Sequence, residues 1–284
     1  MRCNSAMVLT CLHTLTTLLL LLPAEAPASE PEQILLWAGT APGETTQSTG
    51  TPLPRRPTEE PPVVRISGIT APSLSVYPAE HPNGKSVLIL PGGAFRYVVT
   101  NKEGSEFAEL LNEAGITAFV LNYRTSEAGS PDAWRKPLQD ANRALEVIRS
   151  RAPDWHLDAG KIGIAGFSAG GQVAARLLCQ DSSSHSAPPA FGLLIYPWNL
   201  YDPQHTALPA EFRPQADCPP VFLVHTSDDS STALGSVLFY AELKKLNIPA
   251  ELHVFQRGGH GYGLRTADNS QVHTWAELAT FWLR

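Results

Sequence analysis

Short runs of β-branched and aliphatic residues alternate along the chain with longer stretches in which apolar residues recur at helical spacing. The short runs predict strands at residues 86–90, 116–122, 161–165, 191–196, 221–226 and 251–255. The longer stretches predict helices at residues 103–114, 132–151, 169–179, 233–246 and 271–283. This alternation favours an α/β fold, in which a mostly parallel sheet carries helices on both faces.

Two earlier apolar runs, residues 64–66 and 74–76, are interpreted as the antiparallel edge that often flanks such a sheet. The chain has no fixed-period repeat and no heptad pattern. We therefore expect residues 63–284 to form one catalytic domain.

The first 62 residues depart from this alternation. Residues 1–28 combine one arginine, a leucine-rich run and small residues near Ala28, which is the layout of a signal peptide cleaved after that residue. The apolar run is shorter than the roughly 20 residues of a membrane span, so no stable membrane anchor is expected and the mature chain should be secreted or periplasmic. Residues 29–62 are rich in proline and predict an extended lead-in, separate from the catalytic machinery, with an apolar stretch at 34–37 that docks on the main body.

Composition narrows the possible partners. The 284 residues carry 21 Lys and Arg against 27 Asp and Glu, a net charge of -6, so nucleic acid is not an expected partner. After cleavage only Cys179 and Cys218 remain of the four cysteines. Their spacing is no metal signature, and whether they form a disulfide is left open.

One motif carries a specific chemical hypothesis. The stretch Gly166-Phe167-Ser168-Ala169-Gly170 fits G-x-S-x-G, follows a predicted strand and opens a predicted helix, which is the setting of a nucleophile elbow. The sharp reversal lifts the Ser168 hydroxyl above the sheet. It also places the Ala169 N–H at a helix N-terminus, where developing negative charge is stabilised.

A serine nucleophile needs a histidine base and a carboxylate, expected in the order Ser, Asp, His at later strand ends. Asp228 and Asp229 follow the strand at 221–226, and His260 lies between glycines after the last strand. Spacing alone does not separate the two aspartates: we expect one to face His260 and the other to cap the next helix. The Gly92-Gly93 turn after the strand at 86–90 offers further N–H donors for an oxyanion hole.

These motifs together resemble those of α/β-hydrolases of the esterase/lipase type, close to acetylxylan-esterase-like and feruloyl-esterase-like bacterial proteins. The resemblance runs from about residue 34 to the C-terminus, and it also rests on residues 36–39, 122–124, 138–141 and 258–263. It implies Ser168 as nucleophile, Asp229 as acid and His260 as base, because the acid of this family usually stands four residues after a strand histidine, here His225. It further implies oxyanion donors at Gly92, Gly93 and Ala169, and no metal or cofactor.

The chain departs from the family pattern at three places. Pro91 stands where the family has the histidine of its HGGG turn, and Ala94 stands where it has the third glycine. Residues 230–233 replace a Val-Pro that often follows the acid, so the acid loop is expected to be set differently.

The expected activity is hydrolysis of short-chain acyl esters, acetyl esters above all, on a small molecule or on a polysaccharide such as acetylated xylan. The segment 198–217 is too short for a large lid, which favours short acyl groups. Four aromatic residues near strand ends are interpreted either as a sugar-stacking surface or as core: Phe95, Tyr97, Trp198 and Tyr201. Two alternatives stay open, a serine peptidase of the prolyl-oligopeptidase type and a catalytically silent binding module. The sequence predicts no oligomeric state.

Overall fold

The structure of the chain is a computed structural model that describes residues 30–127, 130, 132–180, 187–267 and 269–284. The signal peptide predicted at residues 1–28 lies outside the described residues. Residues Pro31–Arg284 form one compact unit, which is described below.

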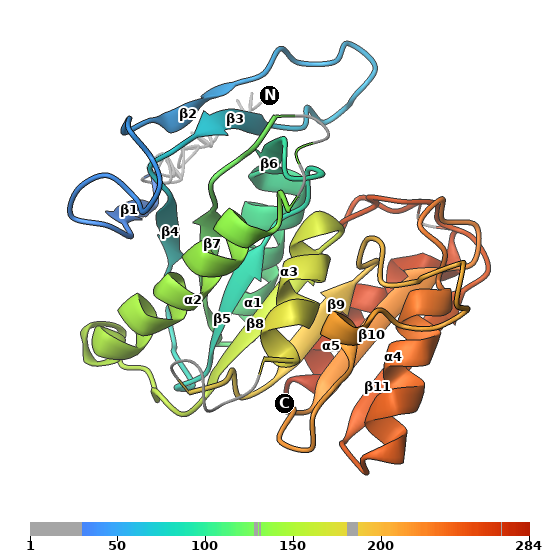
Figure 1. Ribbon diagram of the computed structural model, residues 1–284. Helices are drawn as coiled ribbons and strands as arrows, with labels where there is room; N and C mark the ends of the chain where they lie inside the picture. The colour runs from blue at the N-terminus through green and yellow to red at the C-terminus, as the bar shows by residue number, and fades with distance from the viewer. Residues whose placement is uncertain (1–29, 128–129, 131, 181–186, 268) are drawn as a thin grey trace, which may run out of the picture. The chain divides into compact units, whose positions relative to one another are not determined.

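An eight-stranded sheet runs through this unit (Figure 1). Its strands, in spatial order, are β1 (Glu32–Leu35), β4 (Ser73–Tyr77), β7 (Thr117–Asn122), β5 (Ser86–Leu90), β8 (Ile162–Phe167), β9 (Gly192–Ile195), β10 (Val221–Thr226) and β11 (Ala250–Phe255). Strand β4 is antiparallel to both of its neighbours, β1 and β7. The six strands from β7 to β11 are parallel to one another. The predicted α/β class, with a mostly parallel sheet, is confirmed.

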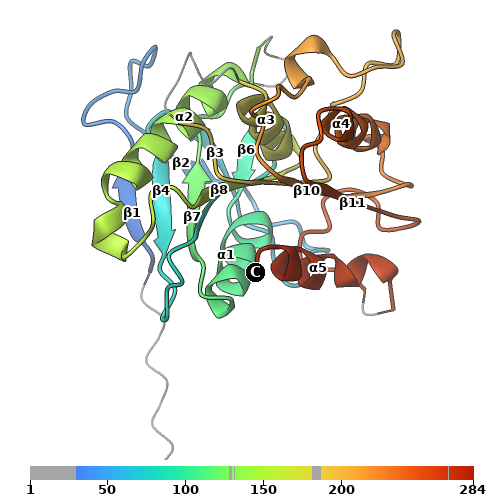
Figure 2. The ribbon, with the colours of Figure 1, turned by 90° about the horizontal axis from the view of Figure 1, so that it is seen from below.

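Helices cover both faces of the sheet, as Figure 2 shows along its edge. On one face lie α2 (Arg135–Ser150), α3 (Ala169–Leu178) and α4 (Leu234–Lys245), and on the other lie α1 (Glu106–Glu113) and α5 (Trp275–Trp282). The predicted helices 103–114 and 271–283 each begin with a differently wound turn, a π turn at Asn101–Ser105 and a 3₁₀ turn at Gln271–Thr274. Helical spacing in the sequence therefore located these elements but not the change of winding at their starts.

The side chains of β5 illustrate how the sheet is buried. Leu88 and Leu90 belong to the apolar cluster on the α2–α4 side, and Val87 and Ile89 belong to the cluster on the α1–α5 side. All four are fully buried. A strand covered on both faces is apolar at nearly every position, which is why residues 87–90 form a continuous hydrophobic run rather than an alternating one.

A second sheet corrects one prediction. It contains β2 (Thr49–Pro52), β3 (Arg65–Ile69) and β6 (Tyr97–Val99), all antiparallel. The run at residues 64–66 was expected at the edge of the main sheet, but it enters β3 of this second sheet instead. The open side of β4 is already taken by β1, where Ile34 pairs with Leu74, so β3 finds no place there.

The proline-rich lead-in is thus part of both sheets, because it supplies β1 and β2. The predicted docking of residues 34–37 is seen at Leu36, which is 1% exposed in the main core. The rest of the lead-in runs over the body without helix between residues 30 and 62. It is extended, as predicted, and it is also structurally integrated.

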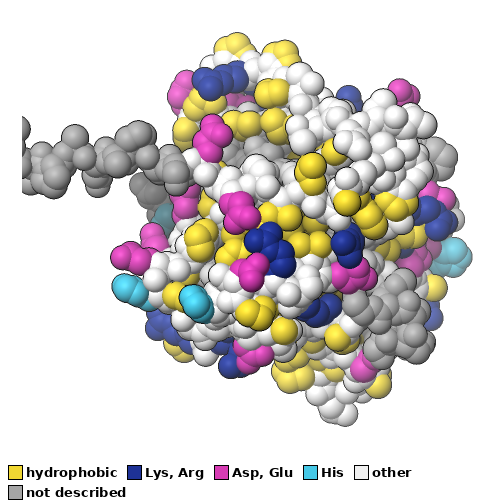
Figure 3. Space-filling model, turned by 90° about the vertical axis from the view of Figure 1, so that its left-hand side faces the viewer, with side chains coloured by type: hydrophobic (Ala, Val, Ile, Leu, Met, Phe, Trp, Pro, Cys, Tyr) yellow, Lys and Arg dark blue, Asp and Glu magenta, His cyan; other side chains and the backbone are white. Residues whose placement is uncertain are grey.

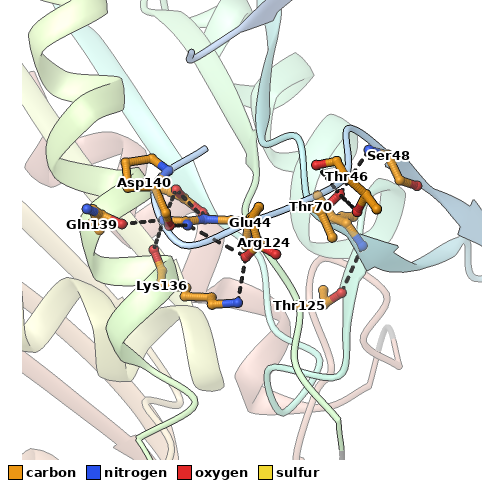
Figure 4. Close-up of polar contacts among 11 residues, drawn as sticks. Glu44, Thr46, Ser48, Thr70, Arg124, Thr125, Lys136, Gln139 and Asp140 are labelled. Carbon is orange, nitrogen blue, oxygen red and sulfur yellow. Dashed lines mark hydrogen bonds and ion pairs between the residues drawn. The ribbon is translucent and has the colours of Figure 1, made fainter. Parts of the chain in front are cut away.

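A buried ion pair joins the lead-in to the body (Figure 4). Arg124, just after β7, is fully buried and binds Asp140 of α2, with 2.8 Å between its guanidinium and the carboxylate. The Arg124 backbone N–H also donates to Asp140, at 2.9 Å. The same guanidinium donates to the carbonyl of Pro42 in the lead-in, at 2.6 Å, and it lies 3.7 Å from Glu44, which also pairs with Lys136. One arginine therefore connects a strand end, a helix and the lead-in.

Charged side chains on the outside are mixed in sign. Figure 3, which faces the β1 and α2 side, shows acidic and basic side chains interspersed with hydrophobic ones. Helix α2 carries an exposed pair of this kind, Arg143–Glu146. Such solvated pairs contribute little to stability, whereas removing one partner of the fully buried Arg124–Asp140 pair would leave an uncompensated charge in the interior.

Candidate active site

Ser168 lies in the reversal between β8 and α3. Its backbone has φ 52° and ψ -118°, a conformation that L-residues other than glycine rarely adopt. The reversal also demands close backbone approach: a Cβ at Gly170 would lie 2.0 Å from the carbonyl oxygen of Leu90. The predicted strand, turn and helix around Ser168 are all present.

His260 and Asp229 complete a hydrogen-bonded line with Ser168. The Ser168 Oγ lies 2.7 Å from His260 Nε2, and His260 Nδ1 lies 2.7 Å from Asp229 Oδ2. The Asp229 carboxylate is buried, whereas the His260 ring is 29% exposed. The structure therefore brings together a hydroxyl, an imidazole and a carboxylate in the order that proton transfer from the serine requires.

The two adjacent aspartates, Asp228 and Asp229, have different partners in the structure. Asp229 faces His260, whereas Asp228 accepts hydrogen bonds from the backbone N–H groups of Gly258 at 3.2 Å and Gly259 at 2.8 Å. These bonds lower the pKa of Asp228, the Gly259 bond most. The expectation that the second aspartate caps the next helix is wrong: Asp228 holds the loop that carries His260, and Thr232 accepts from the N–H of Leu234 at the helix start.

Two further residues hold Asp229 in place. Its Oδ1 accepts the Ser231 N–H at 2.7 Å, and its Oδ2 lies 3.1 Å from Nε2 of the fully buried His225. That same Nε2 lies 2.8 Å from the Ser231 carbonyl oxygen, which can only accept, so Nε2 carries the ring proton. His225 served in the sequence only as a marker for the acid. Ser231 belongs to the segment that replaces the family's Val-Pro, and here it orients the acid by its N–H.

These contacts decide the protonation of Asp229. Burial is the largest single influence and favours the neutral form, but the hydrogen bonds from His225, His260 and Ser231 together outweigh it. The pKa of Asp229 is lowered from its ordinary 3.8 to about 2. The carboxylate is therefore ionised at neutral pH and able to stabilise an imidazolium at His260.

This lowered pKa predicts how stability changes in acid. A carboxyl whose pKa is depressed by almost two units on folding contributes about 2 kcal/mol at neutral pH. That contribution is complete above about pH 5 and is lost as pH falls through 4 toward 2. Denaturant titrations of wild type and Asp229→Asn between pH 7 and about pH 2.5 should show the wild type losing more free energy of unfolding. Equal losses of unfolding free energy in the two proteins would contradict a lowered pKa of Asp229.

The backbone donors differ from the expected set at one position. The Gly92 N–H was expected in the oxyanion hole, but it donates to the buried carboxylate of Glu103 at 2.7 Å, so it is already engaged. Gly93 lies beside Ser168 in the same cavity. Ala169 is the first residue of α3, and a first-turn N–H has no acceptor within its helix. These two N–H groups remain as candidate donors.

A cavity of about 470 Å³ opens over Ser168 and His260. Its walls include Gly93, Ala94, Trp198 and Lys102. Two lead-in residues, Arg56 and Glu59, also line it. The expectation that the lead-in is separate from the catalytic machinery is therefore wrong, because it builds one wall of the cavity.

The four candidate aromatics divide between cavity and core. Tyr97 and Trp198 line the cavity, whereas Phe95 is 4% exposed and packs in the main core. Tyr201 is half-buried and does not line the cavity. The segment 199–217 contains one 3₁₀ turn at Ala210–Phe212, and none of its residues lines the cavity.

The described residues contain no disulfide, no metal-binding cluster and no membrane-spanning helix. Cys179 and Cys218 are both unbonded thiols, and burial raises the pKa of each. Within the described ranges no group of three or more His, Cys, Asp or Glu side chains is arranged to hold a metal ion. None of the helices described has the length and apolar character needed to cross a bilayer.

The chain is similar in sequence to known α/β-hydrolases. A family model described as alpha/beta hydrolase fold matches residues 87–218. The chain is 25% identical over 215 residues to an acetylxylan esterase of Xylanibacter ruminicola, covering 66% of this chain and 43% of that protein. It is 28% identical over 218 residues to endo-1,4-beta-xylanase B of Butyrivibrio fibrisolvens, covering 67% of this chain and 34% of that protein. The chain thus spans less than half the length of these curated relatives.

One solved structure is matched over nearly its whole length, unlike the curated relatives. The acetyl ester-xyloside bifunctional hydrolase of Caldicellulosiruptor lactoaceticus superposes with a TM-score of 0.67 at 28% identity, covering 89% of this chain and 95% of that one. Fold and sequence agree: the chain has the α/β-hydrolase fold and is similar to esterases, an acetylxylan esterase among them.

Proposed function

We propose that the chain is a serine carboxylesterase that removes short acyl groups, acetyl above all, from a carbohydrate such as acetylated xylan. The observation that carries this proposal is the 2.7 Å contact between Ser168 Oγ and His260 Nε2, continued at 2.7 Å to Asp229. This line of groups ends at a cavity wide enough for a small ester. An export signal at residues 1–28 would agree with a polysaccharide substrate.

In the first half of the reaction, His260 Nε2 takes the Ser168 proton while Oγ bonds to the ester carbonyl carbon. The carbonyl π electrons move to oxygen, and the N–H groups of Gly93 and Ala169 stabilise the oxyanion. The intermediate collapses, the C–O bond to the alcohol breaks, and imidazolium His260 protonates the leaving alcohol. An acyl-enzyme remains.

In the second half, His260 takes a proton from water, whose oxygen bonds to the acyl carbon. The Ser168–acyl bond then breaks, His260 returns the proton to Ser168 Oγ, and the carboxylic acid leaves. Asp229 stays ionised throughout, accepts from His260 Nδ1 and keeps the ring oriented. No further reactant is needed for this sequence.

The preference for a short acyl group is supported by the modest volume of the cavity, about 470 Å³, and by the names of the relatives. We expect kcat/KM on p-nitrophenyl esters to be highest for acetate and to fall at least about tenfold by the hexanoate, because a pocket discriminates by about 1–3 kcal/mol per misfitting group. Acetate release from acetylated xylan should accompany this profile. A preference for long acyl chains would overturn the short-acyl assignment.

The two alternative functions have distinct signatures. A peptidase of the prolyl-oligopeptidase type usually carries a propeller, whereas the lead-in here supplies two strands, β1 and β2. A silent binding module has no need of an activated serine. Labelling by a fluorophosphonate probe decides this point, since a folded protein that stays unlabelled would favour the binding module.

A further inference from the structure

Glu103 is a buried carboxylate directly behind the reacting groups, and the acyl-transfer steps above do not use it. It lies in the π turn before α1 and is only 4% exposed. No ion pair to it occurs among the described residues. Burial raises the pKa of Glu103, although hydrogen bonds from Tyr196 and Gly92 favour its ionised form. A carboxyl group is costly to bury without hydrogen-bond partners, so the groups that donate to Glu103 account for its presence there.

The first contact is with the turn that carries the oxyanion donors. Glu103 Oε2 accepts the Gly92 N–H at 2.7 Å. A Cβ at Gly92 would lie 2.6 Å from this oxygen and 2.8 Å from the Ser168 Cβ. The carboxylate, the turn and the nucleophile are therefore in direct contact. Because the Gly92 N–H is held by Glu103, the next peptide, which carries the Gly93 N–H, has its direction restricted.

The second contact leads to the loop that carries the base. Tyr196, at the end of β9 and fully buried, donates its O–H to Glu103 Oε1 at 2.9 Å and accepts the Gly263 N–H at 3.0 Å. Its ring stands edge-on to the His260 ring, with 5.2 Å between centroids. Tyr196 thus holds the histidine loop from beneath at two points, and Glu103 fixes Tyr196.

We propose that Glu103 is a positioning residue that, through Gly92 and Tyr196, keeps the oxyanion turn and the His260 loop in a fixed relation to Ser168. The inference rests on the proposed esterase function, which it deepens. One buried carboxyl group accepts from both sides of the site, from the Gly92 N–H and from the Tyr196 O–H, and leaving a buried donor without an acceptor is costly. Misplacing catalytic groups by about 1 Å lowers rates by about a hundredfold.

Glu103→Ala leaves the Gly92 N–H and the Tyr196 O–H without an acceptor. We expect its kcat on p-nitrophenyl acetate to fall about 100-fold, with KM changed less than about threefold, since Glu103 is almost wholly buried and presents little surface to the cavity. Glu103→Gln retains one acceptor oxygen at the same size, so it should recover part of the loss, to about tenfold below wild type. Tyr196→Phe should resemble Glu103→Gln, and the double variant Glu103→Ala/Tyr196→Phe should lose little more than Glu103→Ala.

Binding of a trifluoromethyl ketone adds a readout that a merely structural role would not change. Ser168 Oγ adds to its carbonyl carbon, His260 takes the proton, and the resulting oxyanion occupies the same place as in the reaction. Its affinity should fall in Glu103→Ala roughly as much as kcat does. The matched control is Glu109→Gln, an exposed carboxylate six residues further along the chain, which should stay within about twofold of wild type.

Activity is assayed well below the midpoint of thermal unfolding of each variant, so that a lower kcat reflects the site and not a loss of folded protein. If Glu103→Ala does not fold, the isosteric Glu103→Gln carries the test. A folded Glu103→Gln with unchanged kcat and unchanged ketone affinity would overturn the positioning role but leave the esterase assignment intact. Failure of the wild type itself to hydrolyse any ester would instead overturn the proposed function, and it would be seen before any variant is made.

Discussion

Ser168→Ala is expected to abolish ester hydrolysis, with kcat on p-nitrophenyl acetate at least about 10⁴-fold below wild type. The variant lacks the atom that forms the acyl bond, and no other described hydroxyl lies against His260 Nε2. The fold should survive, because alanine is no larger than serine and meets the same strained backbone. Circular dichroism and thermal unfolding should therefore match wild type while fluorophosphonate labelling disappears.

A matched control for this experiment is Ser150→Ala. Ser150 is exposed at the end of α2, where its hydroxyl donates to the Val147 carbonyl. This variant should keep full activity and full labelling. Undiminished hydrolysis by Ser168→Ala would remove the nucleophile assignment, and with it the acyl-enzyme mechanism.

Arg124→Met is expected to lower the free energy of unfolding by about 3–5 kcal/mol, the usual effect of removing one partner of a buried ion pair. The loss leaves the Asp140 carboxylate, itself fully buried, without its cation. It also removes the donor to Pro42, so the lead-in loses an attachment. Equilibrium denaturation in urea measures the change directly.

Two comparisons sharpen this result. Lys245→Met removes one partner of a pair whose side chains are 69% and 38% exposed, and it should cost less than about 1 kcal/mol. Arg124→Met combined with Asp140→Leu should recover part of the loss, because the unpaired buried charge is gone. A single Arg124 variant as stable as wild type would show that the pair does not stabilise the fold.

The parts of the molecule that follow local rules were predictable from sequence. The strand at 221–226 was found at its observed bounds, because a strand buried on both faces shows a continuous apolar run, here residues 221–224. Parallel strands bring their carboxyl ends to one edge, so the order Ser168, Asp229, His260 already implied a common location.

The parts that depend on distant contacts were not predictable. Their position after the strand does not distinguish Asp228 from Asp229; the resemblance favoured Asp229 through His225, and the path of the His260 loop decides which carboxylate meets the ring. Glu103 resembles any acidic residue at a helix start, and its meaning depends on Tyr196, 93 residues later. The lead-in was assigned by its proline content, yet proline excludes helix rather than sheet edges.

The position of β1 has one more consequence. A sheet edge presents unpaired N–H and C=O groups to which a strand of another molecule can add, and proteins protect such edges against aggregation. Residues 32–35 occupy the outer side of β4 along four paired positions, from Glu32 with Val76 to Leu35 with Ser73. The lead-in therefore also guards β4 against pairing with another chain.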